Sequence, residues 1–142
     1  MAILRIVKHP NDFLLKQSKE VTEFDASLHQ LLDDMRETMV KAGGLGIAAV
    51  QVGRLLRACI IAVRNENIEL VNPVVLSGTK EKNMEEGCLS VPKDSAKIKR
   101  FHQIVVRAQD RFGKVLEREF AGLAAVCVQH EIDHMNGVLI VQ

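Results

Sequence analysis

Residues 122–137 read GLAAVCVQHEIDHMNG, and no helix-breaking residue stands between Gly122 and Gly137. The run predicts a helix over 122–136 that ends at a glycine C-cap. His130 and His134 are four residues apart, so they lie on one face of that helix with their β-carbons ~6 Å apart. Two imidazoles at this spacing can bind one metal ion. The helix therefore carries the strongest candidate for a functional site.

Glu131 completes the pattern H-E-x-x-H, which is typical of metal hydrolases. It directly follows the first histidine, where its carboxylate can approach a metal-activated water without being a ligand. The alternative is that both histidines have no metal and are either exposed to solvent or hydrogen-bonded within the core. A third metal ligand at a suitable place in the chain would favour the catalytic interpretation.

The third ligand has to come from upstream, because the eight residues after His134 include no His, Glu, Asp or Cys. Cys127 shares the helix with both histidines, but three ligands there would be spread over ~10 Å of rise, so Cys127 is expected to be a pocket wall. Cys59 lies in an apolar run and is expected in the core. Cys88 follows a glycine, can be presented from an extended segment, and is the favoured ligand. The remaining candidates are His102, Glu85 and Glu86.

A second helix is expected over 25–41, with Asp25 or Ser27 as its cap. Its apolar residues recur at helical spacing, at positions 28, 31, 32, 35 and 39. The glycine-rich residues 42–46 follow it as a loop.

Strands are expected over 55–63 and over 68–76, the second interrupted by Pro73. Two more, over 104–109 and 114–120, flank a turn and predict a hairpin. Helices and strands do not alternate regularly. The sequence therefore predicts an α+β fold.

The composition excludes several classes of protein. The 142 residues suit one domain, and 19 basic against 18 acidic side chains give a net charge of +1, so neither DNA nor a membrane is an expected partner. The longest nearly apolar stretch, 120–128, is about half of the ~18–20 residues that span a bilayer. The N-terminus does not have the features of a signal peptide. Three cysteines without paired spacing favour a reducing cytoplasm.

Three motifs together resemble the peptide deformylases. They are GLGIAAVQ at 44–51, EGCLS at 86–90 and QHEIDH at 129–134. His9-Pro10, followed by Leu14-Leu15, is similar to the opening segment of that family. The resemblance implies a single catalytic domain over 1–142, with an α+β fold in which the motif helix packs among antiparallel sheets beside an N-terminal amphipathic helix.

The resemblance also implies an activity and the residues that carry it. The activity is removal of the N-formyl group from the initiator methionine of new polypeptides, by water activated on a divalent metal. Fe²⁺ is expected natively, and Zn²⁺, Ni²⁺ or Co²⁺ are alternatives in purified protein. The implied ligands are Cys88, His130 and His134. The implied catalytic groups are Glu131 as general base and acid, with Gln51 and the backbone amide of Leu89 binding the oxyanion.

The substrate-binding residues follow from the same resemblance, and all except Gly46 are expected around the methionine side chain. They are Gly44, Leu45, Gly46, Leu89, Val126, Cys127 and His130. The expected partners are N-formyl-Met nascent chains near the ribosome. Asp133 is expected to pair with a nearby base, with Arg100 as a candidate. Two alternatives stay open. One is an amidase that acts on another N-acyl substrate. The other is a non-catalytic protein of the same fold in which the metal only stabilises the structure.

The sequence departs from the family pattern at two positions outside the three motifs. Ser95 stands where many members have an arginine, which affects contacts with the peptide rather than the chemistry. The sequence ends at Gln142, where many members continue into a C-terminal helix, so a short form is expected.

Overall fold

Five antiparallel strands form one continuous sheet, in which each strand pairs with its neighbours in the chain. The computed structural model describes residues 2–140, and for residues 91–94 it describes the backbone alone; Met1, Val141 and Gln142, at the ends of the expected domain, lie outside the described residues. The strands are β1 (Gly46–Ala48), β2 (Ala58–Val63), β3 (Glu66–Cys88), β4 (Val91–Gln109) and β5 (Val115–Ala121).

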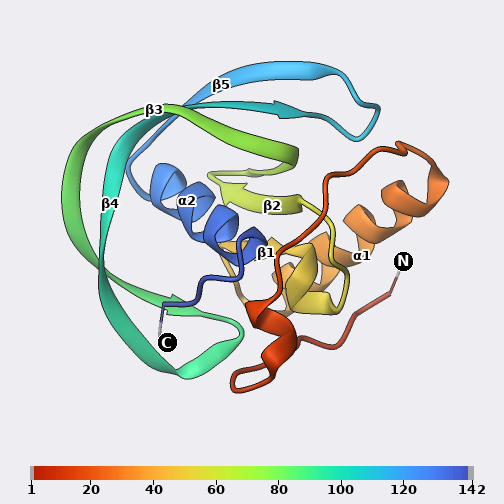
Figure 1. Cartoon of the computed structure of the whole chain (residues 1–142), viewed down its shortest axis with the longest axis horizontal. Helices are drawn as coiled ribbons and strands as arrows, with labels where there is room; N and C mark the ends of the chain where they lie inside the picture. The colour runs from red at the N-terminus through yellow and green to blue at the C-terminus, as the bar shows by residue number, and fades with distance from the viewer. Residues whose placement is uncertain (1, 141–142) are drawn as a thin grey trace.

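The sheet curls around helix α2 (Leu123–Met135), which Figure 1 shows enclosed by the long strands β3 and β4. This helix is the one predicted from the H-E-x-x-H pattern, and Gly137, with φ of 75°, follows its end. The predicted α+β fold is confirmed, with one curled sheet in place of separate sheets.

Helix α1 (Ala26–Ala42) matches the amphipathic helix expected near the N-terminus. The Asp25 side chain caps it by accepting the Leu28 N–H at 3.1 Å, and Gly43 ends it with φ of 71°. Two short 3₁₀ helices, η1 (Asp12–Leu15) and η2 (Ala49–Val52), complete the helical elements of the described residues. None of the helices within residues 2–140 is long and apolar enough to cross a membrane.

Alternate residues of β2 pack into two separate hydrophobic clusters. Cys59 and Ile61 belong to the cluster that includes Val128 of α2. Ala58 and Ile60 belong to the cluster formed with α1. Because successive side chains of a strand point to opposite faces, this short strand is buried between the two helices. Strand β2 packs against α2 through Cys59 and Ile61, and so helps to position the histidines of this helix.

The strand expected over 68–76 is wrong in length, because β3 continues through Pro73 to Cys88. The register with β4 shifts between Val71 and Val74, so the ladder bypasses the proline, which has no N–H to donate. Asn72 adopts a left-handed φ of 51° there, and its side chain donates to the Val21 carbonyl at 2.9 Å and to Gln109 Oε1 at 2.8 Å. A distant segment therefore stabilises the bulge.

Two further strand limits differ from the expectation. Strand β2 begins at Ala58 and not at 55, because residues 55–57 pair with Lys19. Strand β4 begins at Val91, well before 104. The predicted β4–β5 hairpin is confirmed, with Gly113 at φ of 86° in its turn.

Candidate active site

Three potential ligand atoms converge where the end of β3 meets α2. Cys88 is the last residue of β3, and His130 and His134 lie one turn apart on α2. The Cys88 Sγ lies 3.2 Å from Nε2 of His134, which lies 3.2 Å from Nε2 of His130. All three ligand atoms are within 4.8 Å of one another. The structure therefore brings together the three side chains that the sequence favoured as ligands.

This donor set fits a divalent metal ion. Tetrahedral ligands bound at ~2.0–2.3 Å stand roughly 3.3–3.8 Å apart, close to the separations of these atoms. A thiolate and two imidazoles suit iron, zinc, nickel or cobalt. Among the described residues the group comprises these three side chains, so a position stays open for water or substrate, as catalytic sites require.

The electrostatics of the two histidines also favour a cation at this place. Burial lowers the pKa of His134 to about 3, so its imidazole is neutral, which is the form that binds metals. Burial also opposes a charge on His130, but hydrogen bonds with Cys88 and Glu86 outweigh it and raise the pKa of His130 to about 10. The surroundings of His130 therefore favour a positive charge at this cluster.

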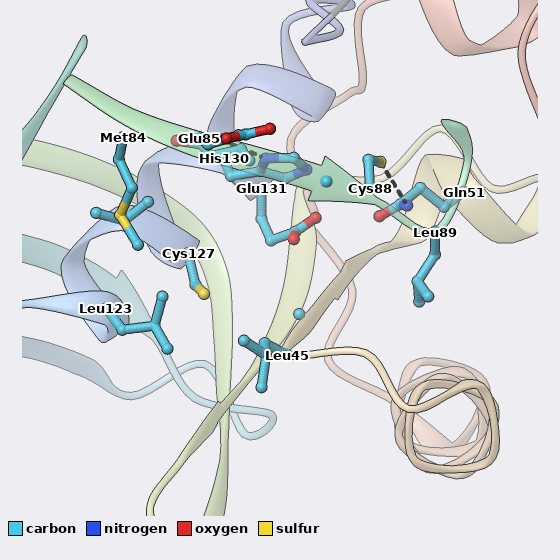
Figure 2. Close-up of a pocket in the computed structure, with 14 residues that line it drawn as sticks. Leu45, Gln51, Met84, Glu85, Cys88, Leu89, Leu123, Cys127, His130 and Glu131 are labelled. Carbon is cyan, nitrogen blue, oxygen red and sulfur yellow. Dashed lines mark hydrogen bonds and ion pairs between the residues drawn. The ribbon is translucent and has the colours of Figure 1, made fainter. Parts of the chain in front are cut away.

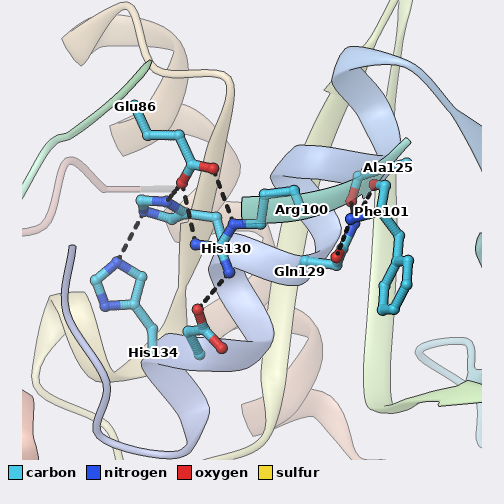
Figure 3. A network of polar contacts seen from close by, with 8 residues as sticks. Glu86, Arg100, Phe101, Ala125, Gln129, His130 and His134 are labelled. Atoms are coloured by element: carbon cyan, nitrogen blue, oxygen red, sulfur yellow. Dashed lines mark hydrogen bonds and ion pairs between the residues drawn. The ribbon is translucent and has the colours of Figure 1, made fainter. Parts of the chain in front are cut away.

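A buried network orients His130 through Nδ1, the ring nitrogen that does not face His134 (Figure 3). Nδ1 of His130 lies 2.9 Å from Oε1 of Glu86. Arg100 donates to both oxygens of the same carboxylate, at 2.8 and 3.0 Å. Burial alone would raise the pKa of Glu86, but these hydrogen bonds lower it. Glu86, a candidate ligand in the sequence, is therefore a charged partner of the candidate ligand His130.

Arg100 also binds Asp133, through a contact of 2.5 Å from Nη1 to Oδ2. The pair expected between these two residues is present. Because Asp133 lies on α2 between the two histidines, the guanidinium joins β3 and α2 at the level of the cluster. The neighbouring Gln129 fixes the same helix to β4, since its amide binds both the N–H and the carbonyl of Phe101, at 3.0 and 2.6 Å.

Glu131 is buried beside the cluster, with Oε1 lacking a hydrogen-bond partner among the described residues. Burial raises its pKa to about 7, a value at which a carboxyl group can both accept and release a proton near neutrality. A β-carbon at Gly46 would lie 2.6 Å from Oε2 of Glu131, so a glycine is needed there for close approach of the carboxylate.

The Gln51 side chain has a fixed orientation. Its Oε1 accepts the Ala48 N–H at 2.9 Å, so its amide nitrogen must point the other way. That nitrogen donates to Ser90 Oγ at 3.2 Å and lies 3.7 Å from Cys88 Sγ. Figure 2 shows this nitrogen directed at the sulfur of the adjacent Cys88. Leu89 lies in the turn after Cys88, so its backbone is adjacent to the same place.

A pocket of about 420 Å³ opens beside this cluster (Figure 2). Six of the seven expected substrate-binding residues line it, whereas Gly44 is not among the lining residues and packs against Leu89, whose Cδ1 would be 2.6 Å from a β-carbon there. The lining consists of Leu45, Gly46, Gln51, Met84, Glu85, Glu86, Gly87, Cys88, Leu89, Leu123, Val126, Cys127, His130 and Glu131.

Three lining residues were not predicted as part of the site: Met84, Gly87 and Leu123. The alternation of residues along a strand could have indicated Met84, which lies two residues before Glu86 on the same face of β3. Helical spacing could have indicated Leu123, which lies four residues before Cys127 on α2.

The other candidate ligands lie elsewhere. Cys59 is fully buried in the core. Cys127 lines the pocket, where burial raises its pKa to about 12 and keeps it a thiol. His102 is on β4, outside the group of converging ligands. Glu85 accepts a hydrogen bond from Ser95 Oγ at 2.8 Å, so Ser95 contacts a residue of the pocket rim.

Comparison with known proteins gives one consistent result. A family model described as polypeptide deformylase matches residues 3–142. The peptide deformylase of Chromobacterium violaceum is 46% identical over 145 residues, covering 100% of this chain and 87% of that protein. A crystal structure of the Legionella pneumophila peptide deformylase matches with a TM-score of 0.94 at 46% identity, covering 98% of this chain and 84% of that one. The class I type b enzyme from Acinetobacter baumannii, solved with Met-Ala-Ser bound, matches with a TM-score of 0.92 at 34% identity, covering 98% and 96%.

Proposed function

Because the chain belongs to the peptide deformylase family, whose members remove the N-formyl group from the initiator methionine of new polypeptides, we propose that Cys88, His130 and His134 hold the metal of its active site. The observation that carries this proposal is the convergence of the three ligand atoms beside a buried carboxylate and an open pocket. A divalent ion bound there supplies Lewis acidity and lowers the pKa of water toward neutrality.

Glu131 is the general base and acid of the proposed mechanism. A formamide does not react with neutral water, so the attacking water must lose a proton as its oxygen adds to the formyl carbon. The Glu131 carboxylate takes this proton, and its raised pKa of about 7 suits the transfer. When the C–N bond breaks, Glu131 returns a proton to the amine nitrogen. The products are formate and a free N-terminal amine.

Gln51 and the Leu89 N–H are the proposed donors to the formyl oxygen. Negative charge develops on that oxygen as water adds, and fixed donors stabilise it more than mobile ones. The Gln51 amide is fixed by Ala48 and Ser90, so it does not need to reorient during the reaction.

The apolar walls of the pocket are proposed to bind the methionine side chain. Leu45, Leu89 and Val126 line it, and a thioether adapts to an irregular apolar cavity. The Acinetobacter relative that was solved with Met-Ala-Ser bound supports a peptide beginning with methionine as the ligand. Cys88, His130 and His134 lie next to this pocket, close to where the N-terminal nitrogen of such a peptide would be.

A direct test compares formyl-Met-Ala-Ser with acetyl-Met-Ala-Ser on metal-loaded protein. We expect turnover of the formyl peptide and at least a hundredfold lower turnover of the acetyl peptide, since the acetyl group carries a methyl where the formyl group has only a hydrogen. Equal rates would instead identify a general N-acyl amidase.

We further propose Fe²⁺ as the native ion, on the basis of the family resemblance. An iron–thiolate site that opens to solvent is sensitive to oxygen at both the metal and the sulfur. Apo protein loaded anaerobically with Fe²⁺ should therefore lose activity after air is admitted, whereas Ni²⁺- or Co²⁺-loaded protein should keep it. An iron form as durable as the nickel form would contradict this proposal.

We also propose that the protein acts in the cytoplasm close to the ribosome, because its substrate is the N-terminus of a nascent chain. Co-sedimentation of the tagged protein with translating ribosomes tests this. Recovery of all the protein in the ribosome-free fraction, under conditions that retain known ribosome-associated factors, would argue against it.

A further inference from the structure

The N-terminal segment of residues 2–9, here called the strap, is bound to α1 and forms none of the strands of the sheet. Figure 1 shows it running from beside α1 toward η1. Two buried side chains of α1 anchor its first half: Asp34 accepts the Ala2 N–H at 2.7 Å, and Thr38 accepts the Leu4 N–H at 2.8 Å.

The second half of the strap reaches the active site through two backbone hydrogen bonds. The Val7 N–H donates to the Gln51 carbonyl at 2.7 Å, and the His9 N–H donates to the Ser90 carbonyl at 2.7 Å. The strap thus binds both η2 and the turn that follows β3. These are the two pieces of chain that carry the proposed oxyanion donors.

A third hydrogen bond closes a ring, because the Gln51 side chain donates to Ser90 Oγ at 3.2 Å. The ring runs from Val7 to Gln51, from Gln51 to Ser90, and from Ser90 back to His9. Gln51 is 1% exposed and Ser90 is fully buried, so little water competes for these bonds. The separation of Val7 and His9 along the strap therefore sets the distance between η2 and the turn.

From this ring we infer that the strap residues Val7 and His9 are positioning residues for Gln51, acting through their backbone N–H groups. The inference rests on the proposed role of Gln51 as an oxyanion donor. A displacement of ~1 Å in a catalytic group can cost as much as ~100-fold in rate. Loosening the ring should therefore lower kcat, while the metal ligands and the methionine pocket remain intact.

The test removes one donor of the ring without changing the chemistry of the site. Val7→Pro deletes the N–H that binds Gln51. Arg5→Pro is the matched control, since Arg5 lies in the strap outside the ring, is exposed, and its N–H makes no hydrogen bond to the described residues. We expect kcat for formyl-Met-Ala-Ser to fall at least ~10-fold in Val7→Pro, with KM within about twofold and metal content unchanged. Arg5→Pro should stay within about twofold of the unmodified protein.

A double-mutant cycle with Gln51→Ala separates positioning from general loss of structure. If the strap acts through Gln51, Val7→Pro should have less than about a twofold effect in the Gln51→Ala background. A full tenfold loss in that background would show that the strap acts by another route and would overturn the inference. Full activity of Gln51→Ala alone would refute the proposed oxyanion role, and the strap's role with it, whereas an active Val7→Pro would refute the strap alone.

A second substitution covers the case in which Val7→Pro does not fold. Replacing Val7 by its α-hydroxy analogue during translation removes only the N–H and keeps the side chain. The same loss of kcat is expected, with an unchanged circular dichroism spectrum. Unchanged kcat in this ester variant would overturn the inference.

Discussion

The Glu86 carboxylate lies 2.9 Å from Nδ1 of His130, while Nε2 of the same ring lies 3.2 Å from Nε2 of His134, in the proposed group of metal ligands. A partner at Nδ1 fixes the tautomer and leaves Nε2 free for a metal. Glu86→Gln removes the charge but keeps the size of the side chain. We expect it to weaken metal affinity ~10–100-fold, measured by competition with a chelator.

The adjacent Glu85→Gln is the control, because Glu85 is exposed and binds Ser95 rather than a ligand. It should leave the metal affinity unchanged. Equal weakening in both variants would mean that the overall negative charge of the site, and not the contact with His130, determines affinity.

Removal of a ligand should release the metal. Cys88→Ser, His130→Ala and His134→Ala are each expected to purify with little bound metal, even after reconstitution. Cys59→Ser and Cys127→Ala should keep it, since Cys59 is in the core and Cys127 forms a wall of the pocket. Metal content by elemental analysis decides between these outcomes, and loss of metal in Cys127→Ala alone would refute the ligand assignment.

The apolar pocket should select for methionine. Burying this side chain contributes roughly 1.5–3 kcal/mol, so formyl-Met peptides should have a kcat/KM at least ~10-fold above formyl-Ala peptides. Met84→Ala should reduce that preference because Met84 lines the pocket. Competition between the two peptides in one reaction measures it directly, and equal rates would show that the side chain binds elsewhere.

Arg111 should stabilise the protein in a pH-dependent way, because it joins the β4–β5 turn to Glu69 and to Asp33 of α1. The hydrogen bond from Arg111 lowers the pKa of Asp33 in the folded state. This stabilisation is therefore present above the unfolded-state value of ~4 and is lost as the pH falls through the lower folded value.

At pH 7, Arg111→Gln should lower the free energy of unfolding by about 1 kcal/mol, a modest value because the ion pairs are partly exposed. The difference from the unmodified protein should shrink below about pH 4. Arg107→Gln, which breaks only an exposed pair with Glu117, should cost less than ~0.5 kcal/mol in the same urea titrations. A deficit for Arg111→Gln that grows on acidification would contradict this assignment.

Local patterns in the sequence were sufficient to predict both helices and the β4–β5 hairpin. The spacing of apolar residues predicts α1, and the uninterrupted run after Gly122 predicts α2. The extent of β3 could not be predicted, because residues 79–83 are polar or charged and become a strand through pairing with β4, which is distant in the chain. The bulge at Pro73 is supported in the same way by Asn72, which binds Val21, a residue 51 positions away in the chain.

The pairing of His130 and His134 could likewise be predicted from their spacing, whereas the role of Glu86 could not. A carboxylate close to Cys88 in sequence could ligate the metal or support a ligand equally well. The choice depends on where β3 crosses α2 and on Arg100, which holds both carboxylate oxygens. Those contacts are set by the curl of the sheet, which no local pattern contains.

The most direct test of the proposed mechanism measures metal content and turnover on the same preparation of Glu131→Gln. This substitution removes the proton acceptor while leaving Cys88, His130 and His134 in place. We predict that the variant keeps its metal and loses ~10²–10⁴-fold in kcat for formyl-Met-Ala-Ser. Retention of near-normal turnover with bound metal would contradict the role of Glu131 as general base.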